Sequence, residues 1–402
     1  MSRAAILVAG ALIAAPALAE GLDAAMGRAL FERAWTPAPA STRASDGLGP
    51  HFDARACAAC HPGLDRPVVV GLAAPAAGMA ARLSDAQGRP DPVYGRQLQT
   101  QATTGLSPEA KLRLRAERRP GDPGPRWRVE AGGLRHGALA KGVILSARLA
   151  PPLFGLAGLE APPDAALHAL AAAQAAAPGP VKGRVSLVDD GTGAQRAGRF
   201  GFKAQDPDLI ARIAGAFHAD MGMSSALRPT HWGDCTTRQR DCRAAPHGAP
   251  DRVGPHEIDA STLGQIAAFL RDRPALAPPS PPSREGAAIF ARIGCAQCHV
   301  EAPGAAFGEA AKLWSDLLLH DLGPRLAGAT EGAARPQDWR TAPLIGLGAG
   351  MAKGRRLLHD GRARTLGEAI GWHDGEARPA RLAHDALTPA DRTALAAFLS
   401  GL

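Results

Sequence analysis

Aromatic residues are scarce in this sequence: they make up 4% of its 402 residues, and only one of them is a tyrosine. Cores in this chain must therefore be built mainly from alanine, leucine and valine. No basic tract is interleaved with aromatic residues, so we do not expect the chain to bind nucleic acid. The formal net charge of +8 is modest and would favour an acidic redox partner or an anionic surface.

Long apolar runs are also missing beyond the first residues. Arg3 precedes an apolar run at residues 4–15, and the small residues Ala17-Leu18-Ala19 follow it. This arrangement is typical of a signal peptide, so we predict that residues 1–19 are removed after Ala19 and that the protein is exported to the periplasm. An uncleaved anchor is the alternative. No later stretch is long and apolar enough to cross a bilayer, which predicts no stable membrane span after cleavage.

Cysteine is rare as well, with six in the chain, and four of them fall into two short motifs. The motifs are Cys57-Ala58-Ala59-Cys60-His61 and Cys295-Ala296-Gln297-Cys298-His299. Two cysteines three positions apart and a following histidine form the attachment pattern of c-type haem. Residues i and i+3 share one face of a helical turn, so both thiols can reach one porphyrin. The sequence therefore predicts two covalently bound c-type haems, with His61 and His299 as iron ligands.

The other two cysteines, Cys235 and Cys242, lie in a polar loop. In an exported protein, a disulfide that closes this loop is the simplest interpretation. A cysteine thiolate as a haem ligand is the alternative.

The same order of elements occurs twice along the chain. A short helix is predicted before each haem motif, at residues 27–35 and 286–293, and an apolar helix ends each half, at 263–270 and 395–399. Such an internal repeat indicates two units of similar architecture.

A proline-rich stretch, residues 274–282, separates the two halves and is predicted to be a stiff linker. We expect an N-terminal haem domain at residues 20–273 and a C-terminal one at residues 283–402. The predicted fold class is mainly α: two cytochrome c-like haem domains, the first enlarged by loops and a small β insertion within residues 90–260. The segments predicted inside this insertion are strands at 127–130, 142–149, 184–188 and 198–203, and helices at 165–176 and 207–219.

Several longer segments are similar to one known family. They include residues 91–98, 150–161, 198–204 and 219–223, and in the C-terminal part Leu317–Gly323, Trp339–Leu344 and Leu358–Ala363. On these segments the chain resembles the di-haem oxidoreductases, which are described as peroxidase-like or thiol-oxidoreductase-like and are related to bacterial di-haem cytochrome c peroxidases. The resemblance implies an oxidoreductase, with the first haem as the reactive site and the second as the electron-transfer site.

The same resemblance suggests a further iron ligand. In the related peroxidases the electron-transfer haem takes its second ligand about fourteen residues after the histidine of a His-Asp-Gly motif. Here His359-Asp360-Gly361 leads to His373, which we expect to bind the second iron, although a place on a solvated helix end is the alternative. A Ca²⁺ ion is implied by the same analogy. Phe202 departs from the family, which usually has tryptophan at this position, so the electron route can differ.

Peroxide cleavage also needs a group that moves a proton. Glu160 is the candidate catalytic acid–base, and a capping or surface carboxylate is the alternative for it. For the second ligand of the first iron, the candidates are His218, Met221 and Met223, and the sequence does not choose among them.

Two other functions stay open: a non-catalytic electron-transfer cytochrome, and an oxidoreductase for thiols or other sulfur compounds. The expected partners are a small redox protein or quinone-linked electron donor and a small-molecule oxidant or reductant.

Overall fold

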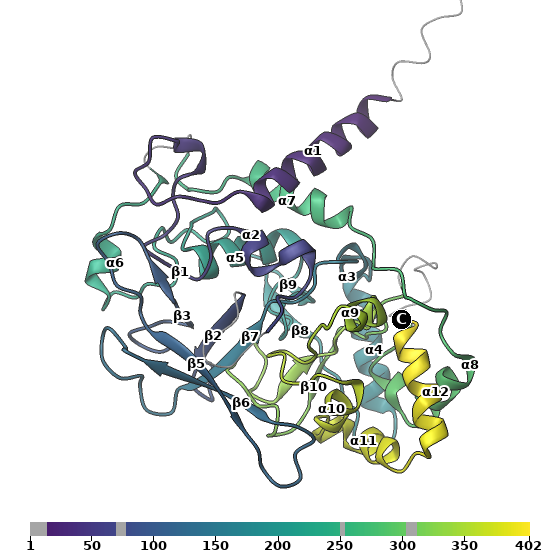
Figure 1. Cartoon of the computed structure of the whole chain (residues 1–402). Coiled ribbons are helices and arrows are strands. Elements are labelled where there is room, and N and C mark those ends of the chain that lie inside the picture. Colours follow the sequence, from purple (N-terminus) through teal and green to yellow (C-terminus); the bar gives the residue numbers. More distant parts are fainter. Residues whose placement is uncertain (1–13, 70–77, 250–253, 303–311) are drawn as a thin grey trace, which may run out of the picture.

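The computed structural model describes residues 14–69, 78–249, 254–302 and 312–402. Its helical content is 32% and its strand content 17%. The prediction of a mainly α fold is therefore wrong, because the strands form several small sheets in both halves of the chain (Figure 1). The helices are α1 (Ala14–Glu32), α2 (Cys57–Cys60), α3 (Ala157–Glu160), α4 (Asp164–Ala176), α5 (Leu209–Met221), α6 (Arg240–Ala244), α7 (Ala260–Arg271), α8 (Arg284–Arg292), α9 (Leu347–Ala352), α10 (Leu366–Gly371), α11 (Arg378–Asp385) and α12 (Pro389–Ser400).

Every paired strand in these sheets runs antiparallel to its neighbour. The largest sheet has the order β3-β2-β7, and the pairs β1-β4, β5-β6, β8-β9 and β10-β11 form separate ladders. The strands are β1 (His51–Phe52), β2 (Met79–Ser84), β3 (Gln97–Leu98), β4 (Gln101–Ala102), β5 (Lys111–Glu117), β6 (Arg126–Gly132), β7 (Ile144–Leu149), β8 (Ser186–Asp189), β9 (Gln195–Gly198), β10 (Leu319–Asp321) and β11 (Asp338–Arg340).

The β5-β6 hairpin shows why these strands form. Leu112 and Leu114 alternate with exposed residues along β5, and Trp127 and Val129 do the same along β6. One face of the hairpin is therefore apolar and packs into a core shared with β2 and β7. The sequence analysis did not predict β2, β5, β10 or β11, and these strands account for much of the error in fold class.

Most of the predicted insertion elements are confirmed. The strands at 127–130, 142–149 and 184–188 overlap β6, β7 and β8, and the helices at 165–176 and 207–219 overlap α4 and α5. The strand predicted at 198–203 is wrong beyond its first residue. The backbone turns there, with positive φ angles at Gly201 (+81°) and Ala204 (+50°), and a strand cannot continue through such conformations.

The predicted repeat is visible as two crossed helix pairs. Before each cysteine motif, a helix packs against the helix that ends that half: α1 against α7, and α8 against α12. Each crossing has a glycine at the contact. A Cβ atom added to Gly27 would lie 1.9 Å from the Gln265 carbonyl oxygen, and one added to Gly286 would lie 2.1 Å from that of Ala394. Only glycine allows the helices to approach so closely, so both halves hold their haem motif in the same way.

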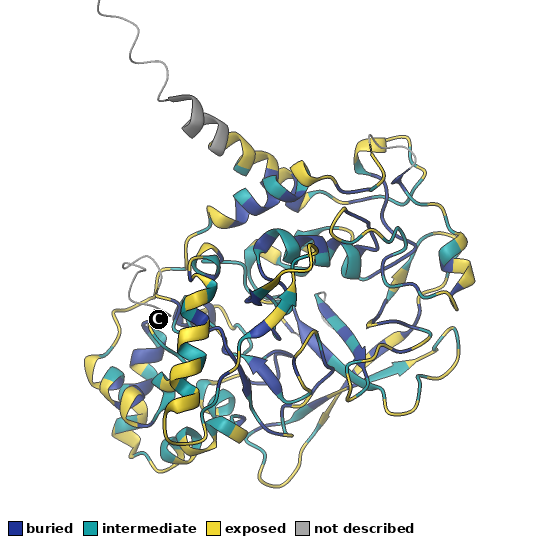
Figure 2. Ribbon diagram, turned by 180° about the vertical axis from the view of Figure 1, so that it is seen from behind, coloured by how far each residue is buried: buried dark blue, intermediate teal, exposed yellow. Residues whose placement is uncertain are grey.

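The described residues of the linker, Pro274–Pro282, are irregular and connect α7 to α8. The division into two domains stays a prediction, since the two halves also contact each other directly: the Arg66 side chain donates to the Arg356 carbonyl oxygen at 2.6 Å. Figure 2 shows buried residues concentrated in the middle of the molecule. Residues 1–13 of the predicted signal peptide lie outside the described residues, and α1 runs through the predicted cleavage position. None of the described helices is both long and apolar enough to cross a membrane.

Candidate functional site

A cavity of ≈ 1110 Å³ connects the two cysteine motifs. Its size exceeds the range of about 300–1,000 Å³ that is usual for a single small-molecule pocket. All four motif cysteines are free thiols. Both cysteines and the histidine of each motif line the cavity: Cys57, Cys60, His61, Cys295, Cys298 and His299.

The first motif lies on a single helical turn, α2, which ends at Cys60. His61 follows, and its Nδ1 lies 2.9 Å from the Pro151 carbonyl oxygen. A carbonyl oxygen only accepts, so Nδ1 carries the proton and Nε2 keeps a free lone pair. Burial lowers the pKa of His61 to about 4 and raises the pKa of Cys57 to about 12. The imidazole is therefore neutral, as a metal ligand must be.

The second motif has a similar local arrangement. Cys295 begins a 3₁₀ turn that ends at Gln297, and Cys298 follows it. The Nδ1 atom of His299 donates to the Trp314 carbonyl oxygen at 3.0 Å, which again leaves Nε2 as the free nitrogen. Burial lowers the pKa of His299 to about 4. In both motifs a backbone carbonyl thus fixes the orientation of the histidine, as is usual for metal-binding histidines.

His373 also lines the cavity, just beyond the end of α10. Its Nδ1 donates to the Ala369 carbonyl oxygen at 2.8 Å, so its Nε2 is free as well. Burial lowers the pKa of His373, and His373 in turn helps to lower the pKa of His299, after the larger effect of burial. His373 therefore lies near the second motif with its Nε2 free, and its role as an iron ligand stays a prediction.

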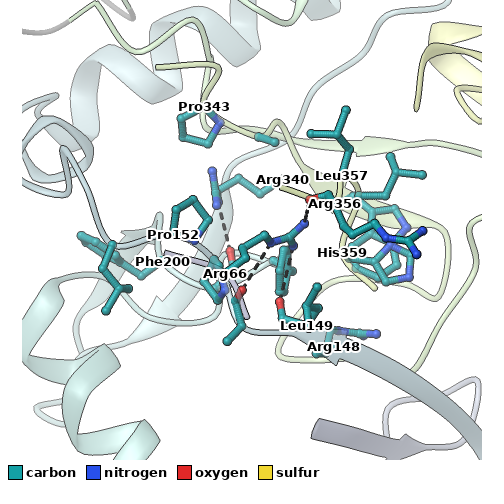
Figure 3. Close-up of a pocket in the computed structure, with 18 of the residues that line it drawn as sticks. Arg66, Arg148, Leu149, Pro152, Phe200, Arg340, Pro343, Arg356, Leu357 and His359 are labelled. Atoms are coloured by element: carbon teal, nitrogen blue, oxygen red, sulfur yellow. Dashed lines mark hydrogen bonds between the residues drawn. The ribbon is translucent and has the colours of Figure 1, made fainter. Parts of the chain in front are cut away.

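Two partly buried guanidinium groups in the cavity have no carboxylate partner among the described residues. Arg66 donates to the carbonyl oxygens of Ala150 (3.3 Å) and Arg356 (2.6 Å). Arg340 donates to those of Gly201 (3.0 Å) and Thr341 (2.9 Å). Burial lowers the pKa of each to about 10. Figure 3 shows both side chains in the pocket, with dashed lines to carbonyl oxygens.

A buried cation is stable only when an anion or several acceptors compensate for the lost hydration. Arg66 and Arg340 therefore provide a place for anionic groups inside the cavity. The carboxylates of a haem are such groups, so the lining fits this cofactor in charge as well as in its thiols and imidazoles.

A pair of carboxylates lines the cavity near the first motif, and the sequence analysis missed it. Gln97 Nε2 lies between them, 2.8 Å from Asp53 Oδ2 and 2.9 Å from Asp220 Oδ1. Burial, and to a lesser degree the charge of Asp220, raises the pKa of Asp53 to about 7, although Thr100 donates to its Oδ1 from both its backbone nitrogen (2.9 Å) and its hydroxyl (2.7 Å). Both carboxylates also raise the pKa of Cys60, after the larger effect of burial, which places them near this thiol.

Glu160, the candidate acid–base, is not among the residues that line the cavity. Its carboxylate accepts two hydrogen bonds from Arg271, at 2.7 and 3.0 Å, and one from the backbone nitrogen of Leu209 at the start of α5 (3.0 Å). These contacts are those of the capping alternative and account for Glu160 without a catalytic role. Its role in catalysis stays an untested prediction.

Among the three candidates for the second ligand of the first iron, only Met221 lines the cavity. Met223 is buried in the core beside the N-terminal helices, and the Nδ1 of His218 is buried without a hydrogen-bond partner. The geometry thus favours Met221 over His218 and Met223.

Two further histidines line the cavity with partners of their own. His320 lies between Asp316 (2.9 Å) and Glu376 (2.7 Å), 3.8 Å from the Cys298 sulfur. Burial opposes its charge, but the hydrogen bonds to Asp316, Cys298 and Glu376 outweigh this and raise its pKa to about 12.

The other histidine, His359, stacks on Trp339 with ring centroids 3.8 Å apart. Burial and four nearby cations lower its pKa well below the usual value. Both rings line the cavity.

Cys235 and Cys242 form a disulfide, as predicted. The alternative, a cysteine thiolate as a haem ligand, is therefore wrong. The expected calcium ion stays a prediction. The groups of candidate metal ligands in the described part of the chain all contain histidine, whereas calcium prefers oxygen ligands.

Two cysteine motifs with free thiols, oriented imidazoles and buried cations around one cavity define a protein with two candidate haem sites. The profile of the family described as "Di-haem oxidoreductase, putative peroxidase" matches residues 125–402. The chain belongs to this family, which makes it a haem-binding oxidoreductase.

A search of curated proteins found no match. A solved structure of hydrazine synthase from Kuenenia stuttgartiensis, pressurized with 20 bar xenon, matches at 17% identity over 49% of this chain and 72% of that chain, with a TM-score of 0.29. At this TM-score the likeness carries no argument about fold or activity.

Proposed function

We propose that the protein is an exported di-haem c-type oxidoreductase that reduces peroxide, with the first haem as the reactive site and the second as the electron-transfer site. The observation that carries this proposal is the single cavity lined by both cysteine motifs. Bound haem iron would supply the redox chemistry. Reduction of hydrogen peroxide to two molecules of water consumes two electrons and two protons, so the chain must accept electrons from a donor and deliver protons to one place.

In this proposal the four motif thiols would hold the two porphyrins through thioether bonds, and His61 and His299 would bind the irons through Nε2. His373, whose Nε2 is free and which lies near His299, would be the second ligand at the C-terminal haem. Arg66 and Arg340 would bind the haem carboxylates. These anions would offset the cost of removing the two guanidinium groups from water.

Asp53 is the proposed acid–base, with Asp220 as its partner. A carboxyl with a pKa of about 7 exists in both protonation states near neutral pH, so it can accept a proton from one oxygen of peroxide and return it to the other. Gln97 and Thr100 hold this carboxyl in place through their hydrogen bonds.

Phe202 stands where the family usually has tryptophan. We therefore propose that Trp339 and His359 form the aromatic contact between the two haem sites. Their stacked rings line the cavity, and Lys203 lies 4.1 Å from the centroid of the Trp339 ring. Two other tryptophans, Trp232 and Trp372, do not line the cavity. A small redox protein or quinone-linked donor would supply the electrons.

The test uses the purified holo-protein. Its ferric spectrum should show one high-spin and one low-spin haem, and added peroxide should shift the high-spin signal while a reduced donor is oxidised. Two low-spin haems that do not respond to peroxide would contradict the proposal and favour a simple electron carrier. Oxidation of a thiol or thiosulfate without any peroxide turnover would favour the sulfur-compound alternative. For attachment, replacing Cys295 and Cys298 by alanine should remove the mass of one haem, and an unchanged mass of haem would refute covalent binding there.

A further inference from the structure

The β5-β6 hairpin carries a concentration of positive charge at the edge of the molecule (Figure 1). Residues 111–135 contain eight lysines and arginines against three acidic residues, an excess of five in a chain whose net charge is +8. The leucines of β5 point into the core, so the charged side chains that alternate with them lie on the side facing solvent. The exposed cations of the two strands and their connection, called the basic face below, are Lys111, Arg113, Arg115, Arg118, Arg119 and Arg128.

The acidic residues of the hairpin do not neutralise this basic face. Glu130 accepts a hydrogen bond from Arg115 at 2.6 Å, and Glu117 accepts one from Arg119 at 2.9 Å. The third, Asp122, pairs with a cation outside the basic face. In the described part of the chain, the other four cations of the basic face form no ion pair: Lys111, Arg113, Arg118 and Arg128.

The strand register brings like charges of the basic face together. Arg115 lies opposite Arg128 in the antiparallel pair, and both are exposed. Like charges at directly opposed positions destabilise a sheet. Along β5, Lys111, Arg113 and Arg115 are two positions apart, which corresponds to roughly 7 Å. Because this spacing is below the Debye length of about 8 Å at physiological ionic strength, the fields of these cations add. A negatively charged partner would offset this repulsion.

The basic face lies next to the haem cavity at both ends of the hairpin. Lys111 is exposed and also lines the cavity, so the cavity reaches the surface there. At the other end, the connection between the strands packs on α10, since a Cβ atom added to Gly371 would lie 2.5 Å from the Cβ of Pro123. Helix α10 leads directly to His373, the proposed ligand at the second haem. A partner on the basic face would therefore lie beside the element that carries this ligand.

We propose that the basic face is the docking site for the electron donor, and that this donor is a small redox protein with an acidic face. This inference rests on the proposed function, which needs two electrons for each peroxide and leaves their docking surface open. Opposite charges steer fast, transient encounters of this kind without a large apolar interface.

Other occupants fit the basic face less well. A second copy of this chain would bring cation against cation in a symmetric contact. A membrane surface is bound best when apolar side chains also insert, and among the described residues the exposed large hydrophobic side chains lie outside the hairpin. The aromatic residue within 111–135 is Trp127, which is buried, so it cannot stack on the bases of a nucleic acid.

The test measures electron transfer into the ferric holo-protein without peroxide, so it does not depend on catalytic turnover. The donor is reduced plant-type ferredoxin, an acidic iron–sulfur protein of low potential, mixed with the protein in a stopped-flow spectrometer at about 20 to about 200 mM salt. We expect the second-order rate of haem reduction to fall steeply as the ionic strength rises. Arg113→Gln combined with Arg128→Gln should lower this rate about 10-fold at low salt, and the difference from the wild type should disappear at high salt.

The matched control is Arg238→Gln combined with Arg284→Gln. It removes the same charge at two exposed arginines, in the disulfide loop and at the start of α8, and neither residue lines the cavity. This control should follow the wild type. Reduced lumiflavin, a small donor without net charge, should reduce all three proteins at the same rate, which would show that the haem sites are intact.

Equal ferredoxin rates in the wild type and the Arg113→Gln/Arg128→Gln variant, or an equal loss in the control, would overturn the proposal. If the same two substitutions abolish binding to anionic phosphatidylglycerol vesicles and leave the ferredoxin rate unchanged, the basic face binds membranes instead and the proposal is wrong. If the ferredoxin rates differ as expected but no peroxide is consumed, the docking site stands and the proposed peroxidase function fails.

Discussion

Asp53 should make the stability of this protein depend on pH in an unusual direction. Its pKa is about 7 in the folded chain and 3.8 in an ordinary aspartate. Between these values the folded chain holds a proton that the unfolded chain has released. This group therefore favours folding at low pH, and the contribution is lost as the pH rises through about 7. At 1.36 kcal/mol per pH unit, the full effect is on the order of 4 kcal/mol, which is an upper bound.

The substitution Asp53→Asn removes the titration and keeps the shape of the side chain. We expect its melting temperature to rise relative to that of the wild type as the pH increases from 5 to 8, by roughly 2–4 °C for each kcal/mol that the carboxylate costs. The assay is thermal unfolding of the holo-protein at several pH values, followed by far-ultraviolet circular dichroism. If Asp53 is the acid–base, the rate of peroxide turnover in the wild type should change with pH near pH 7. The variant should lose this change.

The control is Asp272→Asn, whose carboxylate is 62% exposed and is not among the groups that line the cavity. It should follow the wild type at every pH. A difference in melting temperature between Asp53→Asn and the wild type that stays constant from pH 5 to 8 would refute the argument, because burial would then not have raised this pKa. A difference that shrinks as the pH rises would show that the predicted direction of the pH dependence is wrong.

Two other substitutions test the cavity. His373→Met should keep two ligands on the second iron and raise the midpoint potential of this haem, since a thioether favours reduced iron. If a redox titration shows the same potentials for both haems as in the wild type, His373 does not bind the iron. Arg340→Gln should lower the stability of the holo-protein by about 1.5–3 kcal/mol, the usual range for a hydrogen bond to a charged group, whereas Arg128→Gln on the exposed face of β6 should change it little. Equal melting temperatures for these two variants would show that Arg340 binds no anionic group.

The parts of the site that could be predicted from the sequence are those whose chemistry is local. Both cysteines and the histidine of a haem motif lie within five residues, and their spacing on one turn is enough to suggest a shared porphyrin. The helices before the motifs could be predicted for a similar reason, because their apolar residues recur with helical spacing. The spacing does not predict that α1 crosses α7 at Gly27. This contact depends on how closely two helices that are distant in the sequence approach each other.

The strands were harder to predict because each depends on a partner. The β10 strand has three residues, and its partner β11 begins 17 positions later, so neither segment has a period long enough to recognise. Likewise, β2 pairs with β7 across 60 to 70 positions. The short strands in the C-terminal half therefore became visible only in the folded chain, and the prediction of a mainly α protein failed for this reason.

The carboxylate pair shows the same limit within the site itself. Asp53 and Asp220 are 167 positions apart, and each alone is an ordinary aspartate. They meet because the end of α5 packs beside the segment after β1, where the backbone nitrogen of Asp53 donates to the Asp220 carbonyl oxygen at 2.8 Å. Gln97, from the largest sheet, then donates hydrogen bonds to both carboxylates. Glu160 had the right chemistry and a plausible place in the sequence, but its partners are Arg271 and the start of α5. A proton-transfer group is defined by its distance from the reacting atoms and by its pKa, and the fold determines both.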